Sequence, residues 1–415
     1  MRKRFIDIQE MLVVTPEEQA QQRAETEAEL TAATHEHTER YEEVSSAMDD
    51  VEKAFVAHDA VNTVADEVEK TIEVGGMPVE AANAVTAAVE ALRINLGFRK
   101  NSSPALESFG KGEDRVAATK VALEGLKDTA AKIWEAIKKA LAKLVDWVKA
   151  LFSSQARREQ AVKKKVDEAL KELEKELVGA SSEEKEVRGT RKWRPALLAK
   201  GKPPTVADIE KQLAQNDDLV KWSADFGKLA GASILELEQL SGKSDQRDAK
   251  DTIFRNLISH LKSIPHGNVH MSGETVSIEV SLHLGGGKLI GEATSGGTND
   301  ESISFKLDNR GAAAEPVVGD DLSFEESMRI LRHLNQRASA TGVAKELDKA
   351  LDKINGLISR AQNTKGSNPE DSDELQDIKE LLHASRSIVR TALSAIVEIG
   401  DMALSFSLEA ACVGF

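Results

Sequence analysis

The chain has 415 residues, which is too long for one small core and predicts two to four domains. Its net charge is −15, with 30% charged and only 4% aromatic residues, which argues against an aromatic-lined pocket and favours long helices with charged faces. The single cysteine, Cys412, excludes an intramolecular disulfide and a cysteine-based zinc site.

The first hundred residues have the composition of helices. Met1–Glu10 contains a basic cluster but no apolar stretch after it, so we expect no secretory signal. Glu, Gln, Ala and Thr dominate from Glu17 to about Ser46, and a second helical run covers Val51–Val74. Gly75-Gly76 predicts a break, after which Pro78 fits the first turn of a third helix.

A different kind of helix is predicted from Asp114. Apolar residues recur at steps of three and four, while lysines fill the other face. The apolar positions are Leu123, Leu126, Ala130, Ile133, Ile137, Leu141, Leu144, Val148 and Leu151. Ser153-Ser154 predicts a polar stop, with helix resuming from about Arg157 to Leu177. Residues 108–180 are therefore expected to form a basic amphipathic helical region.

Residues 181–205 contain glycines and prolines among charges and are predicted to be a linker. Thr205 then fits a helix N-cap with Asp208 three residues on, close to a capping box. Helices are expected over about 206–264, with a break near Ser241-Gly242. The next residues, 268–308, predict a small antiparallel β module, because Val276–Leu284 alternates apolar and polar residues and a glycine turn at 285–287 follows.

Two long helices are predicted to close the chain as an antiparallel hairpin over 321–415. The first carries a heptad seam of Val343, Leu347, Ala350, Ile354, Leu357 and Ala361, and a turn at Asn363–Pro369 follows. The predicted fold class is thus mainly α, with long helices, a C-terminal antiparallel helical hairpin and one small antiparallel β module at about 268–308. The predicted domains are 1–107, 108–180, a linker at 181–205, a helical and β-sheet module at 206–320, and the hairpin at 321–415.

Charge is divided between segments of the chain. The first 107 residues hold 10 basic and 22 acidic residues, whereas 127–165 hold 11 basic and 4 acidic ones. Exposed lysines and arginines bind polyanions without sequence preference, through release of counterions. The candidate nucleic-acid-binding residues are Lys127, Lys132, Lys138, Lys139, Lys143, Lys149, Arg157, Arg158, Lys163, Lys164 and Lys165. The same pattern also fits an amphipathic helix with solvated lysines, or a helix lying on a membrane surface.

Together these features resemble the internal head, or inner-body, proteins of giant tailed phages of the phiKZ-like kind. The resemblance rests on three features: the acidic helical N-terminal segment, the junction Pro104–Gly110, and the Ala/Lys/Trp helix at 130–152. It is good over residues 1–180 and extends only to general character beyond them. It implies that residues 1–107 are a propeptide removed by the phage prohead protease. The implied cleavage site is Ala105-Leu106-Glu107, before Ser108.

Three other residue patterns could indicate a functional site. Gly285-Gly-Gly-Lys288 fails the full phosphate-loop pattern because Leu289 follows the lysine, and a glycine turn explains it better. His266, His270 and His283 surround the first strand, but their spacing is not diagnostic of a metal site. No GxSxG, HExxH or Ser/His/Asp arrangement stands out, so we predict no catalytic residues, no metal and no cofactor.

The leading hypothesis is a structural virion protein of the capsid interior. The resemblance implies synthesis in the bacterial cytoplasm as a precursor, and as partners the prohead protease, other head or core proteins and packaged DNA bound non-specifically. It also implies that the mature part lies beside the packaged DNA and can be ejected with it. No small-molecule substrate is expected. The alternative is a membrane-active or host-targeting protein whose acidic segment restrains an amphipathic helix, and a third reading is a helical scaffold that is not processed.

Overall fold

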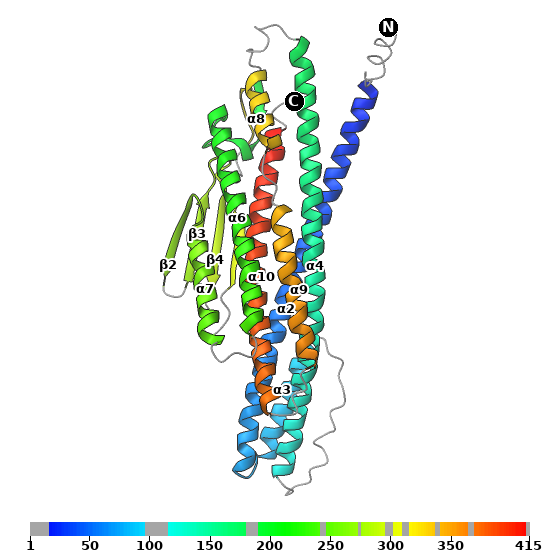
Figure 1. Cartoon of the computed structure of the whole chain (residues 1–415), viewed down its shortest axis with the longest axis vertical. Coiled ribbons are helices and arrows are strands. Elements are labelled where there is room, and N and C mark those ends of the chain that lie inside the picture. Colours follow the sequence, from blue (N-terminus) through cyan, green and yellow to red (C-terminus); the bar gives the residue numbers. More distant parts are fainter. Residues whose placement is uncertain are drawn as a thin grey trace. The chain divides into compact units, whose positions relative to one another are not determined.

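The computed structural model describes residues 16–95, 115–179, 190–240, 246–272, 275–294, 302–308, 315–336, 341–363 and 369–411. Most of these residues are helical (Figure 1). Two compact units can be distinguished: the first comprises residues 1–41 and 149–415, and the second comprises residues 42–148. The mainly α fold class with a small antiparallel β module is confirmed.

The second unit is built from the C-terminal half of α2 (Pro16–Glu73), α3 (Val79–Asn95) and the N-terminal half of α4 (Arg115–Gly179). Buried apolar side chains of α2 and α4 form its core, and Phe55 meets Trp134 edge-on, with ring centroids 6.3 Å apart. The predicted break after Val74 is confirmed between α2 and α3 at Gly75-Gly76, where both φ angles are positive. The two helical runs predicted before this break form one continuous helix, α2. Beside it, the backbone amide of Met77 donates to Thr119 Oγ1 at 2.9 Å.

The apolar seam predicted for α4 is confirmed, because all nine of its residues are buried. The predicted stop at Ser153-Ser154 is wrong: α4 continues through it without interruption. The two hydroxyls donate to the helix itself, Ser153 Oγ to Lys149 O at 3.0 Å and Ser154 Oγ to Leu151 O at 2.7 Å. Serines that bond back to a carbonyl of the preceding turn are compatible with a helix interior.

In the first unit, α6 (Val206–Leu240) packs closely against both α9 (Thr341–Asn363) and α10 (Pro369–Ala411). α7 (Gln246–Lys262) and α8 (Phe324–Gln336) also contact α6. The capping box predicted at the start of α6 is confirmed: Asp208 N donates to Thr205 Oγ1 and Thr205 N donates to Asp208 Oδ2. The α9 seam is confirmed at Leu347, Ala350, Ile354, Leu357 and Ala361, all buried.

The β module is a four-stranded antiparallel sheet in the order β2-β3-β4-β5, drawn beside α6 and α7 in Figure 1. Its strands are β2 (Gly267–Ser272), β3 (Thr275–Ser281), β4 (Lys288–Thr294) and β5 (Ser302–Asp308). β5 packs on α10, where Phe305 N donates to Ser394 Oγ at 2.6 Å. The alternation predicted for β3 is confirmed, with Val276, Ile278 and Val280 buried.

The structure also contains a second, two-stranded sheet that the sequence did not predict. In it β1 (Thr190–Trp193) pairs antiparallel with β6 (Val317–Asp320), and the short 3-10 helix η2 (Pro195–Leu197) follows β1. Trp193 is buried and its Nε1 donates to Asp320 O at 3.0 Å. Part of the segment predicted as a linker, from residue 190 onward, therefore has regular structure.

One segment, Gln376–Ala411 in α10, is long and apolar enough to cross a membrane by length and composition alone. Within the structure, 72% of its most apolar 18-residue stretch is buried, which is typical of the core helix of a folded domain. It also contains the charged residues Arg386, Arg390 and Asp401.

Candidate functional site

Within the first unit, the N-terminal half of α2 lies along the C-terminal half of α4 and is joined to it by ion pairs. Glu36 pairs with Arg157 at 2.8 Å, Glu29 with Lys164 at 2.8 Å, and Glu27 with Lys165 at 3.5 Å. Residue numbers fall on α2 as they rise on α4, so the two helices run antiparallel. We call these three pairs the carboxylate ladder.

The polarity of the ladder reverses at its far end. Arg23 of α2 forms an ion pair with Glu172 of α4, and Thr26 Oγ1 donates to Glu168 Oε1 at 2.7 Å. In the middle of the ladder, the hydrogen bond from Lys164 to Glu29 raises the pKa of the lysine above its usual value. The contacts thus match cation to anion along the helix pair.

An apolar layer lies beneath the ladder. Leu30 of α2 is buried in a cluster that includes Ala161, Val162 and Val166 of α4. The same cluster contains Leu404 and Phe406 of α10, together with residues of β1, α6 and α8. The start of α2 is therefore part of the first unit's core as well as its charged surface.

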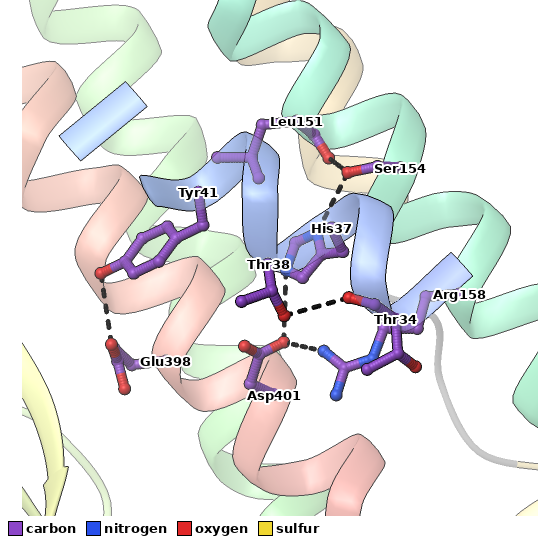
Figure 2. A network of polar contacts seen from close by, with 9 residues as sticks. All are labelled: Thr34, His37, Thr38, Tyr41, Leu151, Ser154, Arg158, Glu398 and Asp401. Carbon is purple, nitrogen blue, oxygen red and sulfur yellow. Dashed lines mark hydrogen bonds and ion pairs between the residues drawn. The ribbon is translucent and has the colours of Figure 1, made fainter. Parts of the chain in front are cut away.

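Figure 2 shows a polar network where α2, α4 and α10 meet. His37 of α2 is 1% exposed; its Nδ1 lies 3.1 Å from Ser154 Oγ and its Nε2 lies 3.3 Å from Asp401 Oδ1. Arg158 of α4 is also buried and pairs with the same Asp401 carboxylate. Asp401 therefore joins a side chain from each of the other two helices.

A second polar contact of α2 with α10 lies one turn further along. The hydroxyl of Tyr41 donates to Glu398 Oε1 at 3.2 Å, and Leu307 N of β5 donates to Glu398 Oε2 at 3.3 Å. Burial, reinforced by the Glu398 charge, holds the pKa of Tyr41 well above its usual value. Burial also raises the pKa of Glu398. This carboxyl thus ties α2 to both α10 and the sheet.

The candidate nucleic-acid-binding residues of the first unit are mostly paired. Arg157, Lys164 and Lys165 are in the carboxylate ladder, and Lys149 pairs with Asp352 at 2.6 Å. Arg158 is buried, which corrects the expectation that the charged face of this helix is exposed throughout. Lys163 is exposed, and no ion pair joins it to another described residue.

In the second unit the candidate residues divide in the same way. Lys127 pairs with Glu69 of α2 at 3.1 Å, and Lys132 pairs with Asp128 at 2.6 Å. Lys138 is buried, contrary to expectation, and pairs with Glu135. Lys139 and Lys143 are exposed and form no ion pair with any residue that the structure describes. The apolar face of α4, required for the membrane hypothesis, is buried here.

The predicted cleavage site and the glycine turn add no residues to this site. The cleavage site at Ala105, Leu106, Glu107 and Ser108 lies outside the described residues. The glycines at 285–287 form the turn between β3 and β4, where Gly285 has φ +72° and its amide donates to Leu198 O.

The three histidines near the sheet have separate surroundings. His266 contacts Asp218 at 3.0 Å, His283 contacts Asp208 at 3.1 Å, and His270 lies exposed in β2. Hydrogen bonds from Thr205 lower the pKa of Asp208 to about 2, so this carboxylate belongs to the α6 N-cap.

Sequence reasoning missed the buried seam of α2 before Val51. Six of its buried residues are spaced seven apart: Leu30, His37, Val44, Val51, His58 and Ala65. Tyr41, Met48 and Phe55 lie four residues after three of them, which completes a 4-3 repeat. The repeat was hidden because polar residues such as His37, Tyr41 and His58 occupy seam positions.

Comparison with known proteins gave one family. The model of the phiKZ-like phage internal head proteins matches residues 25–407. No curated protein and no solved structure matches the chain.

Proposed function

Because this chain belongs to the phiKZ-like phage internal head proteins, a structural family of the capsid interior, we propose that it enters the prohead as a precursor. In this proposal the phage prohead protease cuts after Glu107, and residues 108–415 remain in the head beside packaged DNA. Residues 1–107 act before the cut by covering basic residues of α4. Other head or core proteins are the remaining partners.

The carboxylate ladder is the observation that carries this proposal. Three of the basic residues expected to contact DNA, Arg157, Lys164 and Lys165, each have a carboxylate of residues 16–41 as partner. DNA phosphates bind such cations electrostatically, and the cations condensed on the DNA are released. An acidic segment paired with them therefore competes directly with DNA for the same side chains.

The apolar face of α4 is relevant to the alternative hypothesis of a membrane-active protein. An interfacial helix binds a membrane through an exposed apolar face. In the second unit that face, including Leu126, Ile133 and Ile137, is in the core. The membrane-active function therefore requires the second unit to open first, whereas the structural function does not.

Mass spectrometry of the protein from purified particles tests the proposal. We expect a mature N-terminus at Ser108 and few peptides from residues 1–107. Intact peptides from Met1 in amounts matching those of residues 108–415 would show that the protein is packaged without processing. A catalytically inactive prohead protease provides the control, since the Ser108 terminus should then be absent.

A further inference from the structure

The contacts of α2 lie far in sequence from the proposed cut. We propose that residues 16–73 remain bound as a helix to residues 115–411 after the chain is cut between α3 and α4, so that uncovering the basic residues requires a separate dissociation step. This inference rests on the proposed function in one respect, namely that the chain is cut in the phage.

The first unit supplies one set of contacts. There the carboxylate ladder, Leu30 in its apolar cluster, and the contacts of His37 and Tyr41 all join α2 to α4 or α10. None of these interactions involves residues 96–114, where the cut would fall. Cutting the chain therefore removes none of them.

The second unit supplies an independent set. Val44, Val51, Phe55 and Val61 are at most 3% exposed, and Phe55 contacts Trp134 of α4. Glu69 pairs with Lys127 of α4. The backbone at Gly76 approaches Arg115 so closely that an added Cβ would lie 2.6 Å from the Arg115 carbonyl carbon.

The effect of a cut can be judged by effective concentration. A covalent connection between two bound segments acts as a local concentration, about a millimolar where the linker is short. Cutting it replaces that value by the actual protein concentration and changes no contact. A helix that buries a seam from Leu30 to Val68 and forms ion pairs at both ends should then stay bound at micromolar concentrations.

Polar residues of α2 that face α4 and α10 also fix the register. His37 faces Ser154 and Asp401, Tyr41 faces Glu398, and Thr26 faces Glu168. A helix shifted by one turn would leave the buried His37 and Thr26 and the half-buried Tyr41 without these partners, which is costly. The surface that α2 covers is therefore specific for this acidic helix.

The test uses the full chain with Ala105–Ser108 replaced by the recognition sequence of a site-specific protease. After complete cutting at about 1 µM protein, both fragments are analysed by size exclusion and circular dichroism. We expect the fragments to elute together with unchanged helical content. Separate elution in the absence of denaturant would overturn the inference.

Two triple variants of this cleavable chain test whether the carboxylate ladder holds the two fragments together. Glu27→Lys, Glu29→Lys and Glu36→Lys reverse the carboxylate ladder, and the cut fragments should dissociate about tenfold faster. Glu39→Lys, Asp50→Lys and Glu67→Lys make the same change in net charge at acids that pair with His35, Lys53 and Lys70 of α2 itself. This control should change the dissociation rate less than twofold, and equal effects of the two triples would refute a specific ladder.

The result is independent of processing in the phage. Fragments that separate at once would refute retention even if Ser108 is the mature terminus. Fragments that stay together would support retention even if particles contain uncut protein.

Discussion

At the residue scale, the Asp401 carboxylate contacts side chains of two other helices. It pairs with the buried Arg158 and lies 3.3 Å from the buried His37. Removing one partner of a buried ion pair leaves the other charge without compensation. Because Asp401 is itself 37% exposed, water offsets part of that cost.

Asp401→Asn should therefore lower the free energy of unfolding by about 1–3 kcal/mol, measured by urea denaturation. The matched control is Asp352→Asn. Asp352 pairs with Lys149 but is 66% exposed, so its loss should cost no more than about 0.5 kcal/mol. Equal costs for the two substitutions would mean that the polar network of Figure 2 adds nothing beyond a surface ion pair.

Glu398 gives a prediction about pH. Burial raises its pKa above the ordinary value of 4.5, so the folded chain binds this proton more tightly than the unfolded chain does. Its contribution to stability is therefore present at low pH and is lost as the pH rises through the raised pKa. In urea denaturation, Glu398→Gln should gain stability relative to the parent between pH 4.5 and 7.

Tyr41→Phe provides the complementary test. The Tyr41 hydroxyl donates to Glu398 and thereby favours the charged carboxylate. Without it, the pKa of Glu398 should rise further and the loss of stability with pH should become larger. A pH dependence identical in the parent, Glu398→Gln and Tyr41→Phe would contradict the assignment.

At the element scale, two helical glycines should respond oppositely to the same substitution. Gly356 of α9 has open space around the position of a Cβ, whereas a Cβ at Gly400 of α10 would lie 2.6 Å from Gln155 Nε2. Gly356→Ala should raise the free energy of unfolding by about 0.5–1 kcal/mol through helix propensity. Gly400→Ala should lower it by about 1–3 kcal/mol, because buried Gln155 has little room to move. Urea denaturation measures both, and effects of the same sign would contradict the close approach of α4 and α10.

The elements also show what the sequence could predict. The α4 seam and the alternation of β3 were predictable because a single periodicity of apolar residues governs each. The part of the α2 seam before Val51 was not recognised, since its polar positions are satisfied by partners such as Ser154 and Glu398 that only the fold brings near. β1 and β6 were missed for a related reason: each has four residues, and their pairing joins segments more than a hundred residues apart.

At the scale of the whole molecule, the sequence predicts how charge is divided between segments, but it does not predict which charged residues form ion pairs. The sequence shows an acidic first segment and a basic stretch at 127–165. Counting charges cannot tell which cations have partners. Arg157, Lys164 and Lys165 do, whereas Lys163 between them forms no ion pair with the described residues. The candidate site thus required both the composition and the register of α2 on α4.

Binding of duplex DNA by the intact chain tests whether the carboxylate ladder covers these cations. The triple variant Glu27→Gln, Glu29→Gln and Glu36→Gln leaves Arg157, Lys164 and Lys165 without their carboxylates. Glu39→Gln, Asp50→Asn and Glu67→Gln change the net charge equally at acids that pair within α2. If the ladder competes with phosphates, the first triple should bind DNA at least about fivefold more tightly than the second at low salt, with a steeper loss of affinity as salt rises. Fluorescence anisotropy with a labelled duplex measures both quantities. Equal affinities would show that only overall charge matters, and masking by residues 16–41 would then have no part in the function.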